Sequence, residues 1–186
     1  MRDSTRQILI IGAVSSLAVT AAAVVCGRAE GQSAWRPINA ISHIAWGRKA
    51  AQKNMLTARY TGVGLLLNGV ACGFWAWLYR HCRRSMQFPD SFLFSVGSGM
   101  AISALAYVTD YYVVPRRFTP GFELTLSRRS FPWLYGAFAV GLFTPDVMAS
   151  GRSKMSRSTP TGRCGGYRAS PTATTTSPRL PMPRAS

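Results

Sequence analysis

The sequence predicts an all-α fold: a polytopic membrane helix bundle with three confident spans, a short or truncated fourth, and a disordered C-terminal tail. The 186 residues carry a net charge of +16, and yet their mean hydropathy is +0.07. Charged and apolar residues must therefore be segregated along the chain. Three runs with at most one charge reach the roughly 20 residues that a helix needs to cross a bilayer. We expect a transmembrane domain at 1–150 and a tail at 151–186.

The first predicted span covers residues 7–26, "QILIIGAVSSLAVTAAAVVC", which contain no charge. A signal peptide is the competing interpretation, because Arg2 and Arg6 precede the run and small residues follow at 21–23. The run is longer than the ~7–15 apolar residues of a signal peptide, and further spans follow it. A retained membrane anchor is the better interpretation.

The second and third predicted spans cover residues 61–79 and 92–114. Aromatic residues close each run and arginines follow, a pattern typical of the membrane interface, where amphipathic rings sit at headgroup depth. The third span contains one charged residue, Asp110.

A fourth span is predicted over about 131–145, where Pro132 suits the first turn of a helix. We expect Pro145 and Asp146 to end this helix after about 13 residues, short of the ~17–25 that a span requires.

The tail from 151 to 186 holds seven Lys or Arg and no acidic residue, and is otherwise mostly Ser, Thr, Pro, Gly and Ala. Such a composition cannot bury enough apolar surface to order itself. It also resembles coding sequence translated in the wrong frame. On that hypothesis, another frame from about codon 143 would continue the fourth span with apolar residues.

Small residues form stripes on the second and third spans, where they would let helix backbones approach closely. The stripes comprise Gly62, Gly69 and Gly73 on the second span and Gly99, Ser103, Ala106 and Asp110 on the third. We expect a compact bundle of four antiparallel helices, and a homo-oligomer contact through Gly69 and Gly73.

Polar residues interrupt the apolar stretch "WRPINAISHIAWGRK", which we interpret as an interfacial element at 35–51. On a helix, Asn39 and His43 are four residues apart, as are Ser42 and Trp46, so each pair is expected to form a hydrogen bond. The element should pack on the bundle at the interface, or be partly re-entrant, with its polar groups turned towards protein.

Five polar residues are therefore candidates for function or helix packing: Asn39, Ser42, His43, Asn68 and Asp110. A charge within a span suggests function by default. The alternative for Asp110 is a structural anchor that reaches headgroup water or pairs with Arg116 or Arg117. For Asn68 an interhelical hydrogen bond is the favoured interpretation.

The pattern indicates no catalytic, cofactor-binding or metal-binding residue. A metal site needs three or four converging ligands, and only two histidines and scattered carboxylates are present. Cys26, Cys72, Cys82 and Cys164 have no metal-ligand spacing.

Two segments, "NAISHIAWG" (39–47) and "DYYVVPRRFTPGFE" (110–123), resemble small bacterial inner-membrane proteins of unknown function, which carry an N-x-x-S-H-x-x-W-G element followed by several spans. The resemblance covers about residues 7–142. It implies a multi-pass protein of the bacterial inner membrane and brings no activity, substrate or cofactor.

The positive charge lies in loops beside the spans and in the tail, which favours anionic lipid headgroups as partners over specific nucleic acid. The first and third loops carry ten Lys and Arg against five on the opposite side, which predicts that these loops are cytoplasmic. If the seven Lys and Arg of the tail are added to the five on the opposite side, that side carries the larger number and the predicted orientation reverses.

Two functions remain open from the sequence. The first is a structural or accessory membrane protein without enzymatic activity. The second is a small transporter or membrane-embedded enzyme that uses Asp110 with His43 or Asn68.

Membrane integration is directly testable. Because the spans bury their apolar surface in lipid, carbonate extraction should leave the protein in the membrane pellet. Recovery in the soluble fraction would contradict the predicted fold class.

Overall fold

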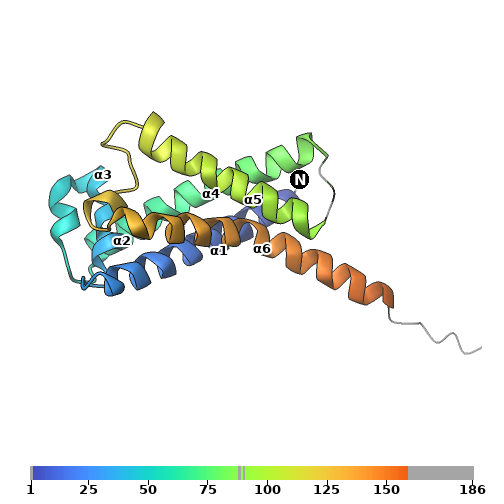
Figure 1. The fold of residues 1–186 in the computed structure, drawn as a ribbon, viewed down its shortest axis with the longest axis horizontal. Coiled ribbons are helices and arrows are strands. Elements are labelled where there is room, and N and C mark those ends of the chain that lie inside the picture. The colour runs from blue at the N-terminus through green and yellow to red at the C-terminus, as the bar shows by residue number, and fades with distance from the viewer. Residues whose placement is uncertain (1, 88, 90, 159–186) are drawn as a thin grey trace, which may run out of the picture.

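The fold is a bundle of four long helices that alternate in direction (Figure 1). The computed structural model describes residues 2–87, 89 and 91–158. The long helices are α1 (Arg2–Ala29), α4 (Val63–Ser85), α5 (Phe92–Val108) and α6 (Phe131–Ser158). The most extensive helix contact joins α1 to α6; α1 also packs on α4, and α5 packs on α6 and less extensively on α4. The predicted all-α membrane bundle is confirmed.

Three helical segments in the described part of the chain are long and apolar enough to cross a membrane: Ser4–Ala29, Ala58–Ser85 and Phe92–Val113. They correspond to the three predicted spans. Their outward faces are apolar, and include Leu17 and Leu66, each about two-thirds exposed on the isolated chain. Apolar side chains on the outside of a bundle are what a lipid solvent requires.

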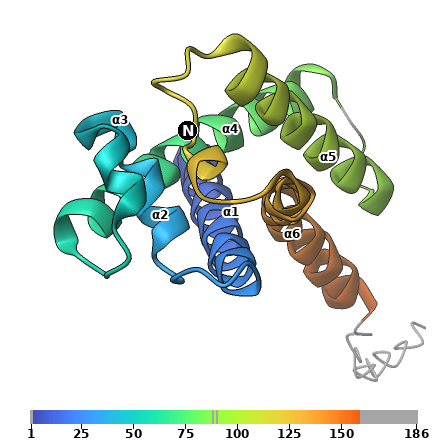
Figure 2. The ribbon, with the colours of Figure 1, turned by 60° about the vertical axis from the view of Figure 1, so that its left-hand side comes forward.

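The last helix differs from its prediction. We expected Pro145 and Asp146 to end it, and this was wrong, because α6 continues through both to Ser158. A proline removes one helical hydrogen bond and can be accommodated when other contacts hold the helix. The Asp146 carboxylate supplies such contacts, to α4. The end of α6 projects past the bundle (Figures 1 and 2). The disordered tail was predicted over 151–186, but residues 151–158 belong to α6, so the prediction is wrong for them; residues 159–186 lie outside the described part of the chain.

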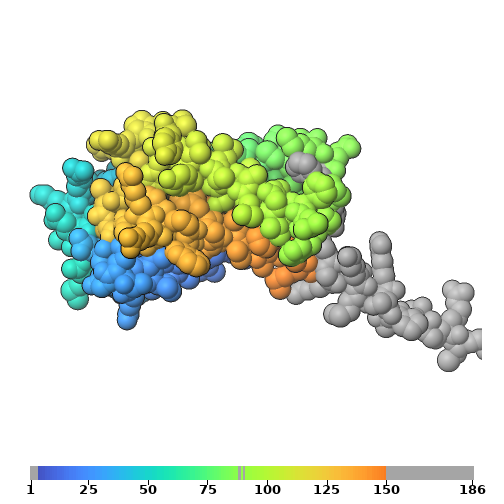
Figure 3. All heavy atoms as spheres, in the orientation of Figure 1, coloured from blue at the N-terminus to red at the C-terminus, as the bar shows by residue number. Residues whose placement is uncertain are grey.

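Small residues allow the long helices to approach closely. A Cβ on Gly141 of α6 would lie 2.4 Å from the Cα of Ser15 in α1, and one on Gly12 would lie 3.1 Å from the Cα of Gly73 in α4. A Cβ on Gly99 of α5 would lie 3.1 Å from the Phe143 ring of α6. The space-filling view shows α5, α6 and α1 side by side on one face (Figure 3).

The predicted stripe on α5 serves a contact within the chain, and the stripe on α4 does so only in part. The stripe on α5 faces α6, since Gly99 packs on Phe143 and the Ser103 hydroxyl donates to the carbonyl oxygen of Tyr135 over 2.6 Å. On α4, the backbone of Gly73 lies close to Gly12 of α1, but a Cβ on Gly73 itself or on Gly62 would meet no atom within 4 Å.

One end of the bundle is covered by residues 30–62 and 114–130, which we call the cap (Figure 2). Its first segment contains the short helices α2 and α3, and its second contains two 3-10 turns. In order along the chain, the short elements are α2 (Arg36–Ile41), α3 (His43–Trp46), a 3-10 helix (Arg48–Gln52), a π-helical turn (Ala58–Gly62), a second π-helical turn that ends α5 (Thr109–Val113), and 3-10 turns at Phe122–Leu124 and Arg128–Ser130.

Glu30 joins the two segments of the cap. Its carboxylate accepts hydrogen bonds from the backbone N–H of Ser127 (2.9 Å) and from the hydroxyls of Ser127 (2.8 Å) and Ser130 (2.5 Å). Burial raises the pKa of Glu30, but the hydrogen bonds from Ser130 and Ser127 outweigh it and hold the pKa below its usual value.

The contact between α1 and α6 gives a matched pair of substitutions. Gly141→Ala should lower the thermal unfolding temperature in detergent, because the added methyl group would overlap the backbone at Ser15. Gly136→Ala, in the same helix, adds a methyl group that meets nothing within 4 Å, and should leave stability equal or raise it by up to about 1 kcal/mol. Equal unfolding temperatures for the two variants would contradict the close approach.

Candidate functional site

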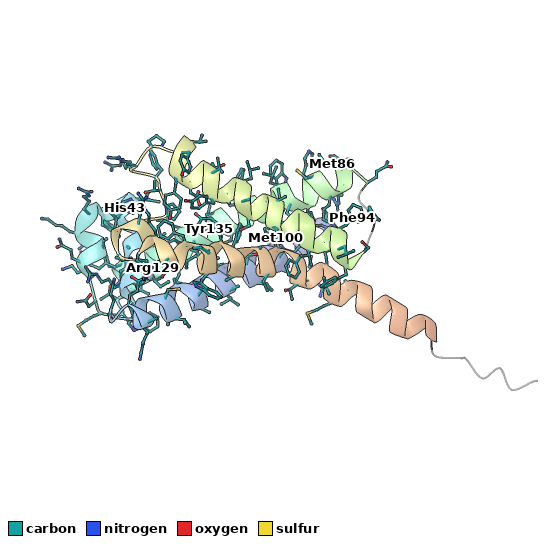
Figure 4. The ribbon with its side chains drawn as sticks, viewed as in Figure 1. His43, Met86, Phe94, Met100, Arg129 and Tyr135 are labelled. Carbon is teal, nitrogen blue, oxygen red and sulfur yellow. The ribbon has the colours of Figure 1, made fainter. Side chains whose placement is uncertain are left out.

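A pocket of about 230 Å³ lies where the bundle meets the cap. All four long helices and both segments of the cap line it. Most lining residues are apolar or aromatic, and three polar side chains converge on it: Asn68 of α4, Asp110 at the end of α5, and Tyr135 of α6. A mostly apolar pocket with a few converging polar groups is the usual form of a ligand site. Tyr135 lies in the half of the molecule nearer the cap (Figure 4).

Asp110 is paired with a tyrosine. The Tyr135 hydroxyl donates a hydrogen bond of 2.7 Å to Oδ2 of Asp110. The predicted pairing with Arg116 or Arg117 is wrong, because the chain becomes extended at Val114 and both arginines are carried to the exposed surface. Tyr135 is 25 residues from Asp110, so local sequence reasoning did not find the pair.

Asn68 forms the interhelical hydrogen bond expected from the sequence. Its amide donates to the hydroxyl of Ser16 over 3.0 Å and to the Ser16 carbonyl oxygen over 3.2 Å, both in α1. The amide also lies 3.4 Å from the hydroxyl oxygen of Thr20. This residue therefore joins α4 to α1 beside the pocket.

Asn39 is the centre of the first cap segment. Its side chain is fully buried, and its amide nitrogen donates to the carbonyl oxygens of Lys53 (2.8 Å) and Met55 (3.0 Å). The hydroxyl of Thr61 donates to the Asn39 side-chain oxygen over 2.7 Å. One side chain thus fixes an extended segment and the π-helical turn that precedes α4 against α2.

The hydrogen bonds predicted within the 35–51 element are wrong. His43 donates through Nδ1 to the carbonyl oxygen of Ala40 over 2.9 Å instead of pairing with Asn39. Ser42 donates to the Asn39 carbonyl oxygen over 2.7 Å, and the Trp46 indole donates to the carbonyl oxygen of Arg59 over 3.2 Å.

The physical reason is a break in the helix at Ser42, between α2 and α3, so residues four apart no longer share a face. The element nevertheless turns its polar groups towards protein, as expected, because Asn39, Ser42 and His43 are all buried. His43 lies at the opposite end of the molecule from Met86 and Phe94 (Figure 4).

A polar cluster at that opposite end was missed. The carboxylate of Asp146 in α6 lies 3.1 Å from a guanidinium nitrogen of Arg80 and 3.4 Å from Nε of Arg83, both in α4. The fully buried Tyr79 donates to the same carboxylate over 3.0 Å. From the sequence, Asp146 was interpreted as the end of a helix. An ion pair of this carboxylate with Arg80 and Arg83, which lie three residues apart in α4, was therefore not predicted.

This cluster bears on the reading-frame hypothesis. Asp146 lies after the suggested change of frame near residue 143, and yet its carboxylate satisfies two arginines and a tyrosine of α4. Buried charges are costly unless paired. The pairing weighs against a change of frame as early as 143. That the later tail is the product of a frameshift stays a hypothesis, which inspection of the nucleotide sequence would test.

Comparison of the chain with protein-family models, curated proteins and solved structures finds no match in any of the three. Within residues 2–87, 89 and 91–158, no three His, Cys, Asp or Glu side chains gather closely enough to hold a metal ion.

The contacts of Asn39 predict a specific pattern of coupling. A double-mutant cycle of Asn39→Ala and Thr61→Val should show a coupling energy of roughly 0.5 kcal/mol or more in unfolding experiments, because the two side chains share a buried hydrogen bond. The cycle of Asn39→Ala with His43→Ala serves as the control and should show weaker coupling. The opposite ranking would contradict the arrangement described.

Proposed function

We propose that the chain is a structural or accessory integral membrane protein without enzymatic activity, in which buried polar side chains fix the packing of helices and cap. The observation that carries this proposal is that the candidate residues are already engaged in tertiary contacts. Asn39 joins α2 to the π-helical turn that precedes α4, Asn68 ties α4 to α1, and Asp110 ties the turn that ends α5 to α6.

The second candidate function is a small transporter or membrane-embedded enzyme. It is favoured by one observation, that Asp110 and Asn68 line the same pocket. A role for His43 alongside Asp110 has less support, because His43 does not line the pocket and its Nδ1 is used by Ala40.

The location proposed is the bacterial inner membrane, on the basis of the resemblance of residues 39–47 and 110–123. Lipid is the partner that the spans imply, and the exposed cations of the loops would attract anionic headgroups. We propose that the cap faces the cytoplasm, since it contains the two loops richest in Lys and Arg.

A homo-oligomer through Gly69 and Gly73 stays a prediction. A Cβ on Gly69 would lie 4.0 Å from the Ser16 hydroxyl of the same chain, and Gly73 packs on Gly12. A Cβ on Gly73 would itself meet no atom within 4 Å, so α1 covers this stripe only in part.

Removal of the Asp110–Tyr135 hydrogen bond tests the structural role. Asp110→Ala and Tyr135→Phe should each lower the free energy of unfolding by about 1–3 kcal/mol, because each removes a partly buried hydrogen bond to a carboxylate. The two effects should not add, since both remove the same bond. Tyr112→Phe, at an exposed tyrosine of the same turn, is the control and should change little.

The alternative function gives a different result. If Asp110→Asn leaves the unfolding temperature unchanged and abolishes proton flux in reconstituted vesicles, measured with a pH-sensitive dye, then Asp110 acts in transport and the structural proposal is wrong.

A further inference from the structure

The pocket opens towards the bilayer. Val70 and Ala71 of α4 line it and are exposed, and both belong to the membrane-spanning segment Ala58–Ser85. On the cap side the mouth is bordered by Phe118, which is 57% exposed. A ligand that passes between these exposed residues would enter from lipid, and so must partition into membranes.

The polar groups in the pocket select for positive charge. Oδ2 of Asp110 accepts from Tyr135, while Oδ1 accepts no hydrogen bond from any residue that the structure describes. No Lys, Arg or His is found among the described residues that line the pocket. An anionic ligand would meet an uncompensated carboxylate, whereas a cation would satisfy it.

The aromatic rings favour the same chemistry. Trp75, Phe118, Phe122, Tyr135 and Phe138 all line the pocket around Asp110. The faces of aromatic rings attract cations, and sites for quaternary ammonium groups are commonly built from several rings. A volume of about 230 Å³ is below the ~300–1,000 Å³ of sites for drug-sized ligands, so the occupant is small.

From these features we propose that the pocket binds a small apolar amine or quaternary ammonium compound, with its cationic group on Asp110 and its apolar part between α4 and α6. This inference goes beyond a structural or accessory role and does not depend on it. The carboxylate supplies charge selection, and the rings supply contact area and cation–π attraction.

Phenyltrimethylammonium and tert-butylbenzene are suitable probes, because they have nearly the same shape and differ in charge. Binding of each to the full chain in non-ionic detergent would be followed by tryptophan fluorescence and by line broadening of the ligand in NMR, with free concentrations corrected for micelle partitioning. We expect the cation to bind at least about tenfold more tightly. Equal affinity for the two probes, or no binding of the cation, would overturn the proposal.

Two variants assign the binding to this pocket. Asp110→Asn should reduce the preference for the cation to near unity, whereas Glu30→Gln, the same chemical change at a carboxyl group in the cap, should retain it. If Asp110→Asn does not fold, Ala71→Phe keeps the Asp110–Tyr135 pair and narrows the mouth, and should weaken cation binding about tenfold or more. Cation affinity that is unchanged in the folded variant would show that the site lies elsewhere. Since this experiment measures binding and the structural proposal is tested by unfolding, either can fail without the other.

Discussion

The contact between the first and last helices is the constraint on which the rest of the molecule depends. In lipid there is little hydrophobic force between helices, so close backbone packing and hydrogen bonds must hold them. At Gly141 and Ser15 the backbones of α6 and α1 meet without an intervening side chain. Two other contacts then join α6 to the remaining helices. Tyr135 bonds Asp110 at the end of α5, and the Asp146 carboxylate pairs with Arg80 of α4, so the four helices form one bundle.

The cap uses a different chemistry, because it lies where the chain leaves the bilayer and its backbone is irregular. Irregular backbone at membrane depth is tolerated only when protein satisfies its polar groups. Asn39 and Glu30 do so, the first by bonding backbone carbonyls of its own segment and the second by bonding the other segment. Since the pKa of Glu30 is lowered in the fold, its contribution to stability is present above the pKa of the unfolded chain and is lost as the pH falls through the folded value.

Hydropathy was sufficient to predict the class of fold and the three spans, because lipid imposes length and composition on every spanning helix. The spacing of small residues predicted the face of α5 that packs on α6. The sequence also predicted that Asn68 would bond another helix. It did not predict the partners of Asp110 and Asn39, since Tyr135 and the backbone at 53–55 are brought near them only by the tertiary fold. The error at Pro145 has a similar origin. A helix-breaking residue was judged by local propensity, whereas the ion pairs of Asp146 with α4 help to hold the helix on both sides of it.

The pairing of α1 with α6 has a consequence for biosynthesis. The ribosome delivers α1 first and α6 last among the described helices, so until α6 is made α4 is the only long helix among them on which α1 packs extensively. The hairpin of α1 and α4 can form early through Asn68 and Ser16, whereas Asp110 has no phenol to bond until Tyr135 has been synthesised. A chain interrupted in the third loop would leave that carboxylate without its partner in or beside the bilayer, where isolated charge is costly. The bundle therefore becomes stable only after α6 has been synthesised, and we expect chains that end before α6 to be degraded by proteases.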